Sequence, residues 1–261
     1  MIEHNFKKKF GQNFISDKNL LEAIGSDAEL EDGDQVLEIG AGQGTLTSVI
    51  ARKAKKVVSY EIDQDLKPAL EGLNLKNVKF VFQDVMDKNL QQIESDFDGE
   101  YKIIANLPYY ITSPIIFKFL GGSKRIKSMT VMVQKEVAER IIATCDSKDY
   151  GVLSVMVAFW GRAKITRVVD RKMFFPQPNV DSAVIRIDVQ KEKFAEVDNK
   201  KFYDFVCACF AMRRKTLKNN LSHSPLIPQA KLKLLPEETL SLRAQSLTAE
   251  QFVSLFRQIF G

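Results

Sequence analysis

Short apolar runs alternate with longer segments of helical periodicity between residues 35 and 134. The runs, in chain order, are QVLEIG, KVVSYEI, NVKFVFQD, YKIIAN and SMTVMVQ. Runs that are apolar on both faces are typical of strands in a parallel sheet that helices cover on each side. The pattern therefore predicts an α/β fold with a doubly wound, mostly parallel, Rossmann-like sheet.

Later strand signals differ in period. SAVIRIDV (182–189) alternates apolar residues with Arg186 and Asp188, and KITRVV (164–169) precedes it, so an antiparallel hairpin at one sheet edge is expected. Beyond a charged linker at 189–201 only helical spacing remains, and Thr248 and Gln251 form a capping box before the last helix. We predict a first domain over residues 1–189 and a small C-terminal helical domain over 190–261.

Composition excludes several kinds of site. Of the 261 residues only three are cysteines, without C-x-x-C spacing, and the two histidines lie near opposite ends. Zinc sites, disulfide scaffolds and histidine triads are therefore disfavoured, and no metal is expected. No apolar run is long enough to span a membrane and the opening lacks a signal-peptide core, so we predict a soluble cytoplasmic protein without a membrane partner.

The first apolar run leads into a glycine-rich loop. VLEIGAGQGTLT places Gly40, Gly42 and Gly44 between a strand and a helix, where glycine lets the backbone approach a ligand. Thr45 breaks the dinucleotide pattern G-x-G-x-x-G. The G-x-G-x-G form preceded by the acidic Glu38 favours S-adenosylmethionine, which has no pyrophosphate.

Acidic residues close the next two strands. Glu61 follows the glycine loop by about 20 residues, where an acid can accept hydrogen bonds from ribose hydroxyls. Asp84 is placed to accept from the adenine amino group. Ile62, which follows Glu61, and Val85, which follows Asp84, are assigned to the same site. Either acid alone could be a helix cap, but their succession along the sheet favours a cofactor site.

The segment NLPYY closes the fourth strand, where ligands of open α/β sheets gather. The side-chain oxygen of Asn106 and the backbone oxygen of Leu107 can accept both hydrogens of an exocyclic amine, which localises its lone pair for methylation. Pro108 fixes the backbone, and Tyr109 offers a ring on which a base can stack. The alternative is a proline turn with Asn106 as an Asx-turn residue.

A second aromatic wall is expected in MFFPQPNVDS (173–182), where two prolines stiffen a loop that can present Phe174 to the other face of the base. By itself this segment would be an ordinary loop with buried phenylalanines. Basic clusters at Lys7, Lys8 and Lys9 and at Arg213, Arg214 and Lys215 could meet a polyanion, although a solvated helix face is an equally good interpretation of any one cluster.

The chain resembles the small-subunit ribosomal RNA adenine dimethyltransferases of the KsgA type. The resemblance rests on KKFGQNF, EIGAGQGTLT, NLPYYITSP, QKEVAERI, YGVLSV, FFPQPNVDSAV and RRKTLKNNL, which follow the family order from residue 7 to 221. A departure is Ala41, where many relatives carry proline.

The resemblance implies a monomer that transfers two methyl groups to N6 of each of two adjacent adenosines. These lie in a hairpin loop near the 3′ end of small-subunit RNA, within an assembling small ribosomal subunit. It adds Asn13 and Ile15 to the cofactor site and assigns the basic residues of both clusters to RNA phosphates.

Three alternatives remain. The related group that methylates one large-subunit adenosine shares the QNF start but usually has NIPY without the YITSP continuation. DNA adenine methyltransferases usually have a separate recognition domain, for which we find no segment. A non-catalytic assembly factor is disfavoured by the intact acids, glycines and NLPYY segment, although both roles can coexist.

Overall fold

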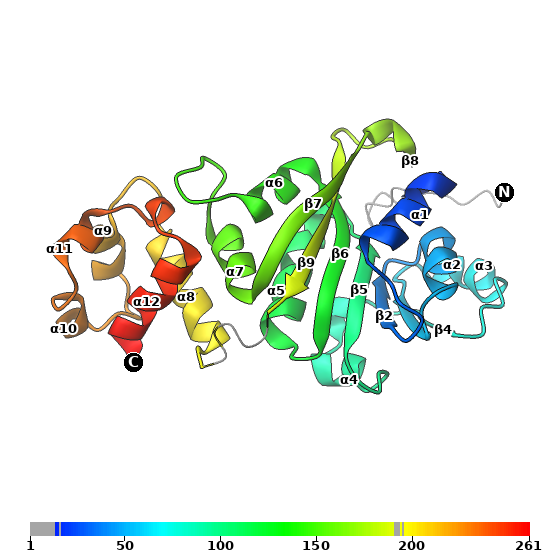
Figure 1. Cartoon of the computed structure of the whole chain (residues 1–261), viewed down its shortest axis with the longest axis horizontal. Helices are drawn as coiled ribbons and strands as arrows, with labels where there is room; N and C mark the ends of the chain where they lie inside the picture. The colour runs from blue at the N-terminus through cyan, green and yellow to red at the C-terminus, as the bar shows by residue number, and fades with distance from the viewer. Residues whose placement is uncertain (1–13, 16, 191–193, 195) are drawn as a thin grey trace. The chain divides into compact units, whose positions relative to one another are not determined.

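The computed structural model describes residues 14–15, 17–190, 194 and 196–261. The chain forms two compact units, and Figure 1 traces both from the N-terminus to the C-terminus. The first unit comprises the described residues of Met1–Ala138 together with Lys164–Val189, and the second comprises those of Glu139–Ala163 and Gln190–Gly261. Within the described residues, no helix has both the length and the apolar character needed to cross a membrane.

A seven-stranded sheet organises the first unit, and its strand order is β4-β3-β2-β5-β6-β9-β7. The strands are β2 (Gln35–Ile39), β3 (Lys56–Tyr60), β4 (Val78–Val81), β5 (Tyr101–Asn106), β6 (Ile126–Gln134), β7 (Gly161–Val169) and β9 (Ser182–Val189). The five neighbouring strands β4, β3, β2, β5 and β6 are parallel to one another, whereas β9 runs antiparallel to β6. A separate ribbon pairs β1 (Phe14–Ile15) with β8 (Phe174–Phe175). The predicted fold class is confirmed, including the antiparallel strand towards one edge.

The helices of this part of the chain connect the strands. They are α1 (Lys18–Asp27), α2 (Thr45–Ala51), α3 (Lys67–Glu71), α4 (Leu90–Glu94), α5 (Thr112–Gly122) and α6 (Lys135–Ile142), with short 3-10 turns at Gln64–Leu66, Val85–Asp87, Tyr109–Ile111 and Arg171–Met173. All five residues of β2 are buried, because helices cover both faces of a parallel sheet.

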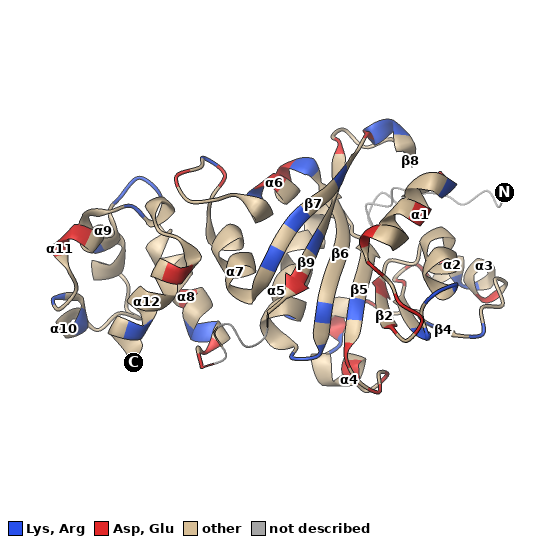
Figure 2. Ribbon diagram, viewed as in Figure 1, with Lys and Arg blue, Asp and Glu red and all other residues tan. Residues whose placement is uncertain are grey.

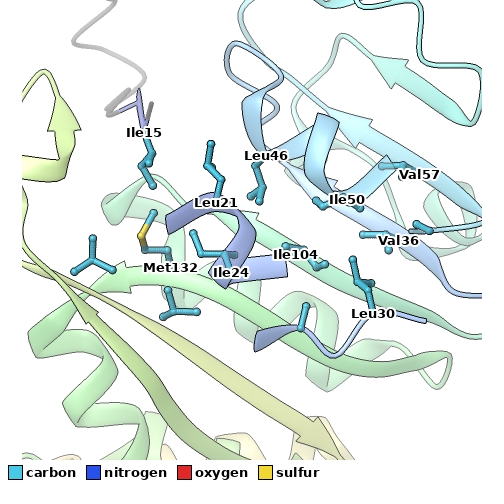
Figure 3. Close-up of a cluster of buried hydrophobic side chains, with 14 of the residues drawn as sticks. Ile15, Leu21, Ile24, Leu30, Val36, Leu46, Ile50, Val57, Ile104 and Met132 are labelled. Atoms are coloured by element: carbon cyan, nitrogen blue, oxygen red, sulfur yellow. The ribbon is translucent and has the colours of Figure 1, made fainter. Parts of the chain in front are cut away.

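One core cluster packs α1 and α2 against the sheet. Asp17 caps α1 by accepting from the Leu20 N–H at 2.7 Å, which sets the start of the helix. Leu21 and Ile24 of α1 then pack in one cluster with Leu46 and Ile50 of α2, as Figure 3 shows. This packing fixes the start of α2, where the glycine loop ends.

The second unit is helical. It contains α7 (Val152–Trp160), α8 (Asn199–Cys209), α9 (Leu217–Ser222), α10 (Gln229–Leu232), α11 (Glu237–Ser241) and α12 (Ala249–Phe260), with a 3-10 turn at Ala244–Ser246. Phe202 and Phe256 meet edge to face at 5.5 Å, and Phe159 of α7 lies 4.4 Å from Phe202. The expected capping box of Thr248 and Gln251 is present.

Residues 139–163 belong to this second unit, whereas sequence reasoning placed them in the first domain. The reason is aromatic packing: the Phe159 ring packs at a tilt against Phe202 of α8, and the Trp160 indole N–H donates to Asn199 Oδ1 at 2.9 Å. The other predicted boundary, between residues 189 and 190, coincides with a junction of the two units.

Candidate active site

A pocket with roughly 1020 Å³ of empty space, part of it open to solvent, lies at the carboxyl ends of β2, β3, β4 and β5. Such an edge is where open α/β sheets bind ligands. The residues that line it come from four strand ends and the loops after them, from β1 and α1, and from the start of α2: Phe14, Ile15, Leu21, Ile39, Gly40, Ala41, Gly42, Gln43, Thr45, Leu46, Tyr60, Glu61, Ile62, Gln83, Asp84, Val85 and Asn106 to Ile111.

The glycine loop needs glycine at all three predicted positions. Gly40, Gly42 and Gly44 have φ angles of 82°, 56° and 76°, in the left-handed region that disfavours other residues. A Cβ on Gly44 would lie 2.3 Å from the Leu73 side chain, and one on Gly40 would lie 3.5 Å from the Asn106 carbonyl oxygen. Gly44 thus permits close packing against Leu73, just beyond α3, and Gly40 lies beside the end of β5.

Glu61 ties the glycine loop to the end of β3. Its carboxylate accepts from the Gly42 N–H at Oε2 and from the Asp63 N–H at Oε1, both at 2.8 Å. The side chain is only 5% exposed, yet it lines the pocket. Burial raises the pKa of Glu61, while the two backbone N–H groups act in the opposite direction. The predicted ribose acceptor is therefore at the pocket wall and already oriented.

Glu38 lies elsewhere. It is fully buried in β2 and is absent from the pocket lining, and its Oε2 accepts from Thr47 Oγ1 at 2.7 Å and Ser59 Oγ at 2.5 Å. Its Oε1 has no hydrogen-bond partner among the described residues, and burial raises the pKa of Glu38 to about 7. The structure thus places Glu38 beneath the loop, where it joins β2, α2 and β3, rather than against a ligand.

Asp84 follows β4 and lines the pocket together with Val85. Its Oδ1 accepts from the Met86 N–H at 2.8 Å, so the residue is the cap that sequence reasoning offered as an alternative. No hydrogen bond to its Oδ2 is made by the described residues. The cap and a ligand contact are compatible, because a carboxylate has a second oxygen. Ile62 also lines the pocket and is 37% exposed.

The segment NLPYY runs from β5 into the 3-10 turn at Tyr109–Ile111. The Leu107 N–H donates to Met132 of β6 at 3.2 Å, and the Pro108 carbonyl accepts from the Ile111 N–H at 3.2 Å. All five residues line the pocket. The predicted proline turn and the predicted pocket position are therefore both present in one segment.

Tyr109 connects two sequence segments that were expected to act together. Its hydroxyl lies 2.8 Å from Ser182 Oγ, at the start of β9 and the end of FFPQPNVDS. Burial raises the pKa of Tyr109, so the phenol stays neutral at neutral pH. Phe174 of the same segment is only 4% exposed, packs in the core with Ile15 and is absent from the pocket lining, whereas Phe175 is 66% exposed.

Two aromatic pocket residues were missed. Phe14 lines the pocket, and its ring packs so closely on Gly42 that a Cβ on Gly42 would lie 2.9 Å from a ring carbon. Tyr110 is 61% exposed and lines the pocket as well. The second tyrosine of NLPYY was a visible signal for Tyr110, and the aromatic between Asn13 and Ile15 was a signal for Phe14. Ile15 itself lines the pocket, while Asn13 and Lys7, Lys8 and Lys9 lie outside the described residues.

Arg213, Arg214 and Lys215, named here the basic turn, are all exposed between α8 and α9 of the second unit. Figure 2 shows basic residues in the segment that leads into α9. Asn220 anchors this turn: it accepts from the Met212 N–H at 2.9 Å and donates to the Cys209 carbonyl at 2.8 Å.

One pocket at the edge of the mostly parallel sheet brings together the glycine loop, the acids Glu61 and Asp84 that follow two of the strands, and the NLPYY segment. This combination defines a Rossmann-like methyltransferase. The family described as Ribosomal RNA adenine dimethylase matches residues 3–260, and the chain belongs to this family. The resemblance inferred from the sequence is thereby confirmed.

Individual relatives agree with this assignment. A protein of Geobacillus sp. (strain WCH70) named Ribosomal RNA small subunit methyltransferase A is 42% identical, over 96% of this chain and 90% of its own length. A dimethyladenosine transferase from Plasmodium falciparum has a similar fold, with a TM-score of 0.83 at 24% identity over 94% of this chain and 96% of its own. The 23S rRNA methyltransferase ErmE aligns with a TM-score of 0.70 at 28% identity, over 95% of this chain and all of its own.

Proposed function

We propose that this protein dimethylates N6 of two adjacent adenosines in a hairpin loop near the 3′ end of small-subunit ribosomal RNA. The reaction would take place in the cytoplasm, on an assembling small subunit, with S-adenosylmethionine as methyl donor. One observation carries the proposal: in a member of the adenine dimethylase family, NLPYY and the glycine loop line the same pocket, and a Cβ at Gly40 would lie 3.5 Å from the Asn106 carbonyl.

The residues present fit S-adenosylmethionine. The left-handed glycine loop lies beside the end of β5, Glu61 presents an oriented carboxylate for ribose hydroxyls, and Asp84 retains an oxygen for the adenine amino group. Ile62 and Val85 give apolar contact for the adenine ring. When bound, the cofactor supplies an electrophilic methyl group.

Asn106 and Leu107 would prepare the amine. The lone pair of an aromatic exocyclic amine is delocalised into the ring and is a poor nucleophile. Two acceptors, the Asn106 side-chain oxygen and the Leu107 carbonyl oxygen, would take both amine hydrogens and favour the pyramidal nitrogen of the transition state. Pro108 contributes a fixed φ of −57° and no competing N–H.

Tyr109 would hold the base. Its hydrogen bond to Ser182 fixes the ring, so that an adenine can stack on it without further ordering. Phe174 lies within β8 of the β1–β8 ribbon, is buried and does not line the pocket, so the structure gives no support to its expected place on the opposite side of the base. A single-stranded loop can deliver its bases to such a pocket at little cost in base pairing.

The basic turn would bind RNA phosphates next to the target loop, and Lys7, Lys8 and Lys9 would add to the same contact. We propose that the protein acts as a monomer. Methylation of large-subunit RNA is the less favoured alternative, since the identity with ErmE is 28%, against 42% with the small-subunit enzyme from Geobacillus.

The proposed function is tested by methyl transfer to small ribosomal particles that lack the modification. Labelled S-adenosylmethionine should place four methyl groups on two adjacent adenosines, as located by mass mapping of RNA fragments. The Asn106→Ala variant should bind particles and cofactor almost normally but methylate at least about tenfold more slowly. Methylation of large-subunit RNA instead, or no transfer by the intact protein, would refute the proposal.

A further inference from the structure

Lys118 of α5 binds the loop that follows β4. Its ammonium donates to the carbonyl oxygens of Val85 at 2.8 Å, Met86 at 2.9 Å and Lys88 at 2.5 Å. An ammonium group has three N–H donors, and here three carbonyls of one short loop accept from it. Since these residues lie 30 to 33 positions away in the sequence, the contact is purely tertiary.

The same loop forms one wall of the pocket. Asp84 and Val85 line it, and Asp84 Oδ1 accepts from the Met86 N–H. Met86 is thus held on both sides, by Asp84 through its N–H and by Lys118 through its carbonyl. The orientation of the Asp84 carboxylate therefore depends on a backbone segment that Lys118 fixes.

The charges around Lys118 suit this contact. Burial lowers the pKa of Lys118, whereas the nearby Asp84 and Asp87 oppose that shift and favour the charged ammonium. Helix α5 starts at Thr112, directly after the NLPYY segment and its 3-10 turn. One helix therefore follows the proposed amine site and also carries the anchor of the Asp84 loop.

We propose that Lys118 is a positioning residue for the cofactor's adenine: its ammonium fixes residues 85–88 so that the Asp84 carboxylate faces the adenine amino group. The inference rests on the proposed function, since it assumes an adenosyl cofactor in the pocket. Asp84 accepts hydrogen bonds, so it should prefer adenine, which carries an amino donor, to hypoxanthine, which carries an oxo acceptor at that position. Loss of Lys118 should weaken this preference specifically.

The test compares the binding of S-adenosylhomocysteine and S-inosylhomocysteine by titration calorimetry. The proteins are the intact chain and the variants Lys118→Met, Lys118→Arg and Lys124→Met, the last being an exposed lysine just beyond α5. Thermal melting without ligand shows whether each variant is folded. The arginine variant keeps N–H donors in the same region and serves as the conservative replacement.

The intact protein and Lys124→Met should both prefer the adenosyl compound. In Lys118→Met the affinity for the adenosyl compound should fall by about tenfold or more, while the affinity for the inosyl compound should change little. Lys118→Arg should recover part of the preference for the adenosyl compound. Equal losses for both compounds, or no loss, would overturn the role of Lys118. Binding of neither compound by the intact protein would overturn the cofactor assignment and this inference with it, whereas equal binding of both would overturn the adenine contact and the role of Lys118 but leave the cofactor assignment intact.

Discussion

Replacement of Glu61 by alanine tests the cofactor site most directly. In the free protein the Glu61 carboxylate holds the Gly42 N–H and the Asp63 N–H, each at 2.8 Å. It is 5% exposed, so water replaces it poorly. The substitution should therefore loosen the glycine loop and also remove the proposed acceptor of the ribose hydroxyls.

The magnitude follows from these bonds. A hydrogen bond to a charged group contributes about 1.5 to 3 kcal/mol net when it is buried. Loss of one such bond to the ribose should raise the dissociation constant of S-adenosylmethionine roughly 10- to 150-fold, and loss of both should raise it further. Release of Gly42 and Asp63 should appear separately, as a lower melting temperature of the ligand-free protein.

Titration calorimetry with S-adenosylhomocysteine measures the first effect and thermal melting the second. Glu71→Ala, which removes an exposed acid from the neighbouring α3, is the matched control and should change neither. Glu61→Gln should also bind poorly, because its amide NH₂ would face one of the two backbone N–H donors. A folded Glu61→Ala variant with an unchanged dissociation constant would refute the ribose assignment.

Three further predictions concern folding and RNA binding. Since burial raises the pKa of Glu38 from 4.5 to about 7, the folded protein binds this proton more tightly than the unfolded chain. The free energy of unfolding should therefore fall by up to about 3 kcal/mol as the pH rises through that range. In Glu38→Gln the free energy of unfolding, measured by urea titration, should depend less on pH. Replacing Arg213, Arg214 and Lys215 of the basic turn by acidic residues should weaken particle binding and flatten its salt dependence without changing cofactor affinity. An unchanged slope of log affinity against log salt concentration would contradict RNA contact. Gly44→Ala should lower the melting temperature markedly, because its φ of 76° and the Leu73 contact both exclude a side chain, and a stable variant would disprove this.

The sequence alone determined the fold class, the family and several of the residues that line the pocket. Strands buried on both faces must be apolar throughout, so β2, β3 and β5 were visible as continuous runs. The residues after such strands gather at one sheet edge, which allowed Gly40, Glu61 and Asp84 to be assigned before their positions were known. All three line the pocket.

Tertiary structure decided which polar groups reach that pocket and what holds them. Glu38 and Glu61 both adjoin the glycine loop, yet the first lies beneath it on Thr47 and Ser59 while the second lines the pocket. The pairing of Tyr109 with Ser182 spans 73 residues, and the bonds of Lys118 to the Asp84 loop span about 30. No local periodicity encodes such contacts, because they arise only when helices pack on the sheet and bring distant loops together.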